Sequence, residues 1–316
     1  MMRKTVLEVT QRAAQTQALK KITAGHELLP PAENGVRYVL FQTQTANQKP
    51  VAAAPAETPA PEKKPFRDPF AKEHLEQDLF VAQLHDTHNV VLNKFNVVDE
   101  HVVLPTIEFE AQETPLSKAD FRAMWTAMGA LDAFAFFNCG YESGASQPHK
   151  HMQLISYSSM KSYTNLDMPP LLQFIHDRLQ TQASDGIVHL RDLPFFHFLH
   201  RIDLPADIDD QVAADQLHAI YATVLQQLNA TAYPGSQEAA ATSTATATAD
   251  RFVAYNLLLT KSFLFVVPRK TQRFNGIEVN AIGFIGSFFV RNDEQRAFFE
   301  TQGPMELLRQ VTFPPM

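Results

Sequence analysis

Ser143-Gly144-Ala145-Ser146-Gln147-Pro148-His149-Lys150-His151-Met152-Gln153-Leu154 is the stretch that best indicates the fold, because a small polar loop runs directly into a strand. His149, His151 and Gln153 stand at alternate positions, and the β-prone run 154–157 follows. An extended backbone places alternate side chains on one face of a sheet. The small residues before them can bring backbone N–H groups close to an anion. The stretch therefore predicts two imidazoles and an amide beside an anion-binding loop, which suits chemistry on a phosphate.

The composition is that of an ordinary globular protein with an acidic balance. The 316 residues (35.5 kDa) are enough for one large core or two small ones, and 45% of them are hydrophobic. The formal net charge of −7 and the pI of about 5.9 give no support to a nucleic-acid partner. A polyphosphate substrate would therefore need a local basic pocket.

Cysteine and hydrophobic runs narrow the class of protein further. Cys139 is the one cysteine, which excludes an internal disulfide and a cysteine metal cluster. Residues 1–20 lack an apolar core of signal-peptide length, and no later run approaches the ~20 apolar residues that cross a bilayer. We therefore expect a soluble cytoplasmic protein with no membrane partner, with the nucleus as an alternative location.

Two low-complexity insertions interrupt the patterned sequence. Residues 50–65 are rich in alanine and proline, which favours extended, solvated conformations. Residues 236–249 form an alanine–threonine run that is expected to be disordered. The remaining sequence predicts a catalytic N-terminal domain over residues 1–185 and a C-terminal domain over residues 190–316.

Helices are expected in three places. Residues 3–22 suit an amphipathic helix whose buried stripe would be Val6, Leu7, Ala13, Ala14 and Leu19. Ser117, with Asp120 three residues later, is typical of a helix cap. The apolar residues after this cap recur at helical spacing, and Trp125 among them is expected to be helix core. A third helix is expected over residues 215–228.

The expected strands pair as hairpins rather than as crossover units. They are residues 36–41, 89–95, 101–105, 131–138, 252–259 and 263–268. The pair 89–105 and the pair 252–268 each carry a lysine near the bend and end in proline, which hints at a duplicated unit. Few βαβ alternations are visible, so an antiparallel α+β fold is favoured over a doubly wound sheet.

The histidine spacing by itself leaves three interpretations open. A neutral imidazole is a competent nucleophile toward phosphorus near pH 7. Histidines at alternate positions can also bind a metal ion, and a structural role is slightly more common than either. His197 and His200 lie in an aromatic run and are expected to be packed, while His85 and His88 receive no role.

Asn138-Cys139-Gly140 and the segment 143–153 together resemble the catalytic segment of the diadenosine tetraphosphate phosphorylases. These enzymes, also called ATP adenylyltransferases, are a transferase branch of the histidine triad superfamily. Further landmarks follow in the order of the family: Asp68-Pro69-Phe70 resembles its Asn-Pro-Phe element, residues 92–104 resemble its strand pair, and residues 194–198 and 255–269 resemble its C-terminal half. The resemblance runs from about Arg37 to Phe289.

The resemblance implies a histidine-triad-like fold and a reversible double displacement. His151 would attack an α-phosphate of diadenosine tetraphosphate, expel ATP and carry the adenylyl group, which phosphate would then take up as ADP. His149 would orient the site and Gln153 would hold the phosphoryl oxygens. The substrate-binding positions implied by the family are Asn93 and Lys94 near the nucleotide, Asn138, Gly144, Ser146 and Gln147 around the phosphates, and Lys261 and Arg269 as a clamp on the terminal phosphates of ATP.

No dedicated metal ligand set is visible, so a divalent cation such as magnesium is expected to arrive with the polyphosphate. The expected partners are small nucleotides and phosphate. Two departures from the family pattern are Pro148, where an acidic residue commonly stands, and Cys139, which is expected to be packing. Alternatives are another nucleotidyltransferase of the superfamily, a nucleotide-binding sensor that Pro148 has silenced, and a metal-dependent enzyme.

Overall fold

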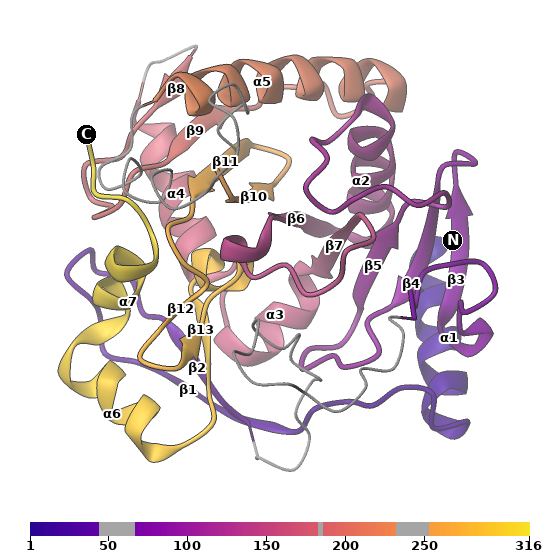
Figure 1. Cartoon of the computed structure of the whole chain (residues 1–316), viewed down its shortest axis with the longest axis horizontal. Helices are drawn as coiled ribbons and strands as arrows, with labels where there is room; N and C mark the ends of the chain where they lie inside the picture. The colour runs from indigo at the N-terminus through magenta and orange to yellow at the C-terminus, as the bar shows by residue number, and fades with distance from the viewer. Residues whose placement is uncertain (44–66, 183–185, 232–252) are drawn as a thin grey trace, which may run out of the picture.

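The computed structural model describes residues 1–43, 67–182, 186–231 and 253–316. The insertions predicted at 50–65 and 236–249 lie outside these described residues. A large antiparallel sheet forms the centre of the described chain, and helices and a smaller sheet surround it (Figure 1). Among the described helices, none is long and apolar enough to cross a bilayer.

The central sheet has nine strands, and each neighbouring pair is antiparallel. Strand β6 of the first half is hydrogen-bonded to β10 of the second half, so the predicted domains contribute to one continuous sheet. The predicted antiparallel α+β class is confirmed. The spatial order is β3 (Phe80–Leu84), β4 (His88–Leu92), β5 (His101–Pro105), β7 (His151–Ser156), β6 (Ala133–Cys139), β10 (Tyr255–Leu259), β11 (Phe263–Pro268), β9 (Phe198–Arg201) and β8 (Ile187–Val188).

Three helices pack on one face of this sheet: α1 (Met2–Gln15), α2 (Lys118–Leu131) and α5 (Asp210–Ala230). Their apolar residues share a core with strand residues such as Phe137 and Leu154. The predicted cap of α2 is confirmed: Ser117 Oγ accepts from the backbone N–H of Asp120, and the Asp120 carboxylate accepts from the N–H of Ser117. This capping box satisfies two backbone N–H groups at the helix start.

Helix α1 is shorter than the sequence predicts. It ends at Gln15, and Gln17 takes a left-handed conformation with φ of 58°. Beyond that point the chain is extended, and the N–H of Ile22 donates to the carbonyl of Asn96. Val6 and Ala13 are buried as expected, but Leu7 is exposed. The helical pattern in residues 16–22 was therefore outweighed by tertiary hydrogen bonds to the β4–β5 connection.

The opposite face of the central sheet is covered by helices from both halves of the chain and by a three-stranded sheet. In the small sheet, β1 (Ala24–Leu28) pairs antiparallel with β2 (Val39–Thr43), which pairs in parallel with β14 (Ser287–Val290). The strand predicted at 36–41 thus begins only at Val39.

The other elements are α3 (Tyr157–Thr164), α4 (Pro170–Gln180), α6 (Asp293–Thr301), α7 (Gly303–Val311), β12 (Arg273–Phe274), β13 (Ile277–Glu278) and the 3-10 helices η2 (Gln77–Leu79), η3 (Tyr141–Ser143) and η4 (Ala281–Ile285).

Candidate functional site

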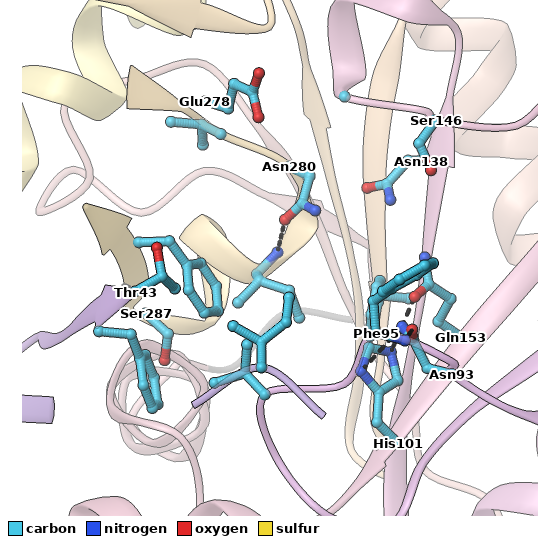
Figure 2. A pocket seen from close by; sticks show the side chains of 18 of the residues that line it. Thr43, Asn93, Phe95, His101, Asn138, Ser146, Gln153, Glu278, Asn280 and Ser287 are labelled. Carbon is cyan, nitrogen blue, oxygen red and sulfur yellow. Dashed lines mark hydrogen bonds between the residues drawn. The ribbon is translucent and has the colours of Figure 1, made fainter. Parts of the chain in front are cut away.

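A cavity of about 250 Å³ lies between this second face of the central sheet and the small sheet. Figure 2 shows Asn93, His101 and Gln153 on one side of the cavity, and Thr43 and Ser287 on the other. Five of the predicted site residues line its wall: Asn93, Asn138, Gly144, Ser146 and Gln153. The strand register explains this grouping, because Gln153 lies opposite Phe136 on β6 and shares its face of the sheet with Asn138.

His151 is the first residue of β7, and a backbone carbonyl sets its tautomer. Its Nδ1 lies 2.8 Å from the carbonyl oxygen of His149. Because a carbonyl oxygen can only accept, Nδ1 carries the hydrogen, and in the neutral ring Nε2 carries the lone pair. The side chain is 5% exposed, and the ring of Phe70 lies 5.3 Å from the imidazole, centroid to centroid. His151 is thus a shielded imidazole whose tautomer is defined by the His149 carbonyl.

His149 is arranged differently, since acceptors face both of its ring nitrogens. Nδ1 donates to the Asp68 carboxylate at 2.7 Å, and Nε2 lies 2.9 Å from the carbonyl oxygen of Thr106. Both ring nitrogens are therefore engaged by groups of the protein. The side chain is buried and fixes the backbone whose carbonyl holds His151. The two histidines therefore differ in how their ring nitrogens are engaged, although both lie on the same short segment.

Gln153 is oriented by a residue that the sequence reasoning missed. The Nε2–H of His101 donates to Gln153 Oε1 at 2.9 Å, so the amide NH₂ of Gln153 is left for the cavity that the residue lines. Asn93 Nδ2 lies 3.3 Å from the nitrogens of the His101 ring, and Asn93 Oδ1 accepts from the N–H of Phe95. His101 opens β5, which pairs with β7, so its proximity to Gln153 depends on a long-range strand register.

Asn138 supplies a second oriented amide. Its Oδ1 accepts from Asn256 Nδ2 at 2.8 Å and from the backbone N–H of Ala281 at 3.0 Å. A backbone N–H can only donate, so the oxygen of the amide is identified and its NH₂ must point elsewhere. Since Asn138 lines the cavity, the NH₂ groups of Asn138 and Gln153 are two neutral donors on one wall, suited to phosphoryl oxygens.

Gln112 connects the backbones of the two central site residues, and it was also missed. The ladder between β6 and β7 ends at the pair Phe136–Gln153. Beyond it, Gln112 accepts from the N–H of His151 at 2.9 Å and donates to the carbonyl of Asn138 at 2.8 Å. The buried Gln112 side chain thus takes the place of the backbone hydrogen bonds that would continue the β6–β7 pairing, and it holds the two strand ends at a fixed separation.

The loop before the histidines is held tightly against the C-terminal half. Gly144 has φ of +83°, and a Cβ there would lie 2.9 Å from Asn280 Cβ, so only glycine permits the approach. Ser146 is exposed and lines the cavity, whereas Gln147 is half-buried and is not in its wall. Pro148 is exposed, and its carbonyl accepts from the N–H of Gln112.

The structure contradicts the predicted phosphate clamp. Arg269 is 2% exposed, and burial lowers its guanidinium pKa to about 9. It fastens the C-terminal half to the loop, because its donors meet the carbonyls of Val311, Ser143, Thr271 and Val279 and the side-chain oxygen of Asn256. A guanidinium with its five donors engaged in this way has none to offer a phosphate.

Lys261 and Lys94 are not in the cavity wall either. Lys261 lies at the β10–β11 turn, at the opposite end of β10 from Tyr255, with its Nζ 3.1 Å from the centroid of the Trp125 ring. Burial lowers the pKa of Lys261 to about 8. Lys94 Nζ is paired with the Glu76 carboxylate at 2.6 Å. The clamp was predicted from a basic patch and from the family resemblance, and neither shows where the β10–β11 turn lies relative to the cavity.

The described wall therefore lacks the basic pocket that the sequence argument required. Its one arginine, Arg291, is paired with Glu278 at 2.9 Å, and the described wall contains no lysine. No group of three or more His, Cys, Asp and Glu side chains placed to hold a metal is found among the described residues. Anion binding at this wall depends on the neutral amide donors and the backbone.

Three residues expected to be packed are buried in the structure. Cys139 is fully buried, and desolvation raises the pKa of its thiol to about 12. Trp125 is buried in α2. His197 is buried between backbone groups, and desolvation lowers its pKa to about 4.

Two family models together cover most of the chain. A model described as the Ap4A phosphorylase N-terminal domain matches residues 1–174, and one described as the ATP adenylyltransferase C-terminal domain matches residues 191–314. Diadenosine tetraphosphate phosphorylase 2 of Saccharomyces cerevisiae is 27% identical over 252 residues, which is 72% of this chain and 70% of the yeast protein. The crystal structure of yeast Ap4A phosphorylase Apa2 has a TM-score of 0.74 at 20% identity, covering 100% of this chain and 98% of the yeast chain. A structure of Apa2 in complex with Ap4A gives a TM-score of 0.73 at 22% identity, with the same coverage.

Proposed function

The chain belongs to the Ap4A phosphorylase family, since the N-terminal model alone matches more than half of it, and we propose that it catalyses the reversible phosphorolysis of diadenosine tetraphosphate. The products with phosphate are ATP and ADP. The yeast relative carries this activity in its name, and Apa2 has been crystallised with Ap4A. The proposal rests on one observation above the others, which is the fixed tautomer of His151 beside two oriented amides.

The first step forms one bond and breaks one. The Nε2 lone pair of His151 attacks an α-phosphorus, the bond from that phosphorus to its bridging oxygen breaks, and ATP leaves with the bonding electrons. The ring becomes a positively charged N-adenylyl imidazolium, and its Nδ1–H donates to the carbonyl of His149. That hydrogen bond strengthens as the ring gains charge, so it stabilises the transition state more than the ground state. Phosphate then attacks the same phosphorus, ADP forms, and Nε2 recovers its lone pair.

The two amides fit the charge that develops on the phosphoryl oxygens. Gln153 and Asn138 each have their oxygen occupied by a donor from the protein, so neither needs to reorient when the charge appears. Magnesium would fit this wall as a partner of the polyphosphate, because the described residues leave most of the substrate charge without a lysine or arginine. When bound, it would supply the positive charge that neutral amides cannot.

The test is intact-protein mass spectrometry after mixing with diadenosine tetraphosphate in the absence of phosphate. Wild type should gain about 329 Da, one adenylyl group, and should lose it as ADP when phosphate is added. His151→Ala should gain nothing. Spectra are recorded from neutral solution, because phosphoramidates hydrolyse in acid. A wild type that binds nucleotide and forms no adduct would favour a nucleotide-binding sensor instead.

His101 offers a second test of the same arrangement. His101→Leu removes the N–H donor that orients the Gln153 amide. We therefore expect kcat to fall about 10- to 100-fold with a smaller change in KM. His101→Gln restores an N–H donor on a more flexible side chain and should recover part of the loss. Steady-state kinetics on diadenosine tetraphosphate measure both. Equal losses in the two variants would mean that the imidazole acts by packing, not by orienting the amide.

A further inference from the structure

Ser287 has a buried hydroxyl without a partner, and it lies in the wall of the cavity. The residue is 1% exposed, and its Oγ has no hydrogen-bond partner among the described residues. Buried hydroxyl groups are almost always hydrogen-bonded, because desolvating one without compensation is unfavourable. Thr43, which also lines the cavity, follows that rule by donating to the carbonyl of Val290. Among the buried side-chain atoms without a partner in the described chain, Ser287 Oγ is the one whose residue lines the cavity, so its partner can be a bound ligand.

The surroundings of Ser287 suit an aromatic ring, not a phosphate. On the small sheet Ser287 and Phe289 share a face, as do Phe41 and Thr43 on the adjacent strand, and all four line the cavity. The rings of Phe41 and Phe289 stack at 5.2 Å between centroids. Ile282 and Met160 add further apolar wall. A flat ring with a polar edge can be buried here, whereas a phosphate would lose its hydration to apolar neighbours.

The position of Ser287 relative to Gln153 indicates which part of a bound nucleotide would reach it. Figure 2 shows Ser287 across the cavity from Gln153, whose amide would hold the phosphoryl oxygens in the proposed reaction, and from His101, which orients that amide. A nucleotide with its phosphate at Gln153 would therefore direct its base toward the small sheet. The backbone that carries Ser287 is closely packed, because a Cβ at Gly286 would lie 3.0 Å from the backbone nitrogen of Leu171.

We propose that Ser287 recognises the polar edge of the nucleobase and does so permissively. This inference rests on the proposed function, since it assumes that a nucleotide occupies the cavity. A hydroxyl both donates and accepts, so it can pair with an amino group, a ring nitrogen or a carbonyl. The contact thus increases the affinity for a purine nucleotide without discriminating between adenine and guanine.

The experiment compares Ser287→Ala with wild type by calorimetric titration of AMP and GMP, and by displacement of AMP with ribose 5-phosphate. We expect the variant to bind AMP and GMP each about 5-fold more weakly, as for the loss of one hydrogen bond. Its affinity for ribose 5-phosphate, which has no base, should not change. Equal weakening for all three ligands, or none, would overturn the proposal. A crystal structure in which Ser287 bonds only an ordered water beside bound AMP would overturn it as well.

Ser159→Ala is the matched control, because Ser159 is a buried serine outside the cavity wall whose Oγ is hydrogen-bonded to Ser156. Ser159→Ala should lower the melting temperature, whereas Ser287→Ala should not, since its hydroxyl has no protein partner to lose. A melting temperature lowered as much by Ser287→Ala would show a structural role and contradict the inference. Wild type that binds no AMP would instead contradict the proposed function, so the two failures are distinguishable.

Discussion

His151→Ala should lower the rate of diadenosine tetraphosphate phosphorolysis by at least about 10⁴-fold. The nucleophile forms the covalent intermediate, so without it phosphate would have to displace ATP directly at a site arranged for an imidazole. The fold should survive, because the hydrogen bond of the ring Nδ1 is local and runs to the carbonyl two residues earlier. Single-turnover kinetics with quantified ADP and ATP measure the loss, and AMP titration verifies that the pocket still binds nucleotide.

Variants of the neighbouring pair provide the control for this prediction. His149→Ala and Asp68→Ala disturb the backbone that carries the acceptor for His151, but they leave the nucleophile in place. Residues that act through another group typically contribute 10- to 100-fold, so both should retain a measurable adenylyl adduct. Asp68→Asn keeps an acceptor for His149 Nδ1 and should be milder than Asp68→Ala. If His149→Ala were as inactive as His151→Ala and formed no adduct, the assignment of the nucleophile would be wrong.

The distinction between the two histidines shows what the sequence could and could not predict. Period-two spacing placed His151 and Gln153 on one face, and the register of β7 agrees with it. Spacing does not reveal which ring nitrogen of each imidazole carries the hydrogen. That depends on the carbonyl of His149 and on Asp68, which lies some 80 residues away in sequence. The role proposed for His151 therefore comes from family resemblance, and the tautomer set by the His149 carbonyl is compatible with it.

Long-range pairing also explains the residues that were missed. His101 and Gln112 act on Gln153 and His151 across strand neighbours or from a loop, and no local pattern indicates either contact. The error at Arg269 has the same origin. A basic patch in sequence was interpreted as a clamp, but strand register buries Arg269 against Asn256 and the loop, where it serves as a structural fastener. Local signals such as the Ser117 cap were predicted correctly because their partners lie three residues apart.

Lys150→Met should destabilise the protein by about 3–5 kcal/mol, the usual effect of removing one partner from a buried ion pair. Lys150 lies between the two histidines in sequence, yet alternation turns it to the other face of the sheet, where its side chain is fully buried. Its Nζ lies 2.6 Å from the carboxylate of Asp120, and His88 Nε2 lies 2.8 Å from the other oxygen of that carboxylate. Chemical denaturation of the purified variant measures the change in unfolding free energy.

Two comparisons isolate the buried charge as the cause. Lys161→Met makes the same substitution in an exposed pair with Asp167 and should leave stability within error. Lys150→Met combined with Asp120→Asn removes the stranded carboxylate and should recover at least half of the loss. No recovery in the double variant would mean that packing of the lysine stem, not the charge, sets the cost.

The pH dependence follows from the same carboxylate. Burial alone would raise the pKa of Asp120, but the hydrogen bond from His88 and the charge of Lys150 outweigh it and bring the pKa to about 2. A carboxyl whose pKa is lower in the folded state contributes stability that is present above its unfolded value of 3.8 and is lost as the pH falls toward 2. Wild type should lose stability across that interval more steeply than Lys150→Met, in which the carboxylate has lost its ammonium partner. Lys150 connects the start of the strand that carries His151 to the start of α2. Lys150→Met should therefore also lose activity at temperatures where it remains folded. Such a loss would show that the position of His151 depends on an ion pair on the opposite face of the sheet.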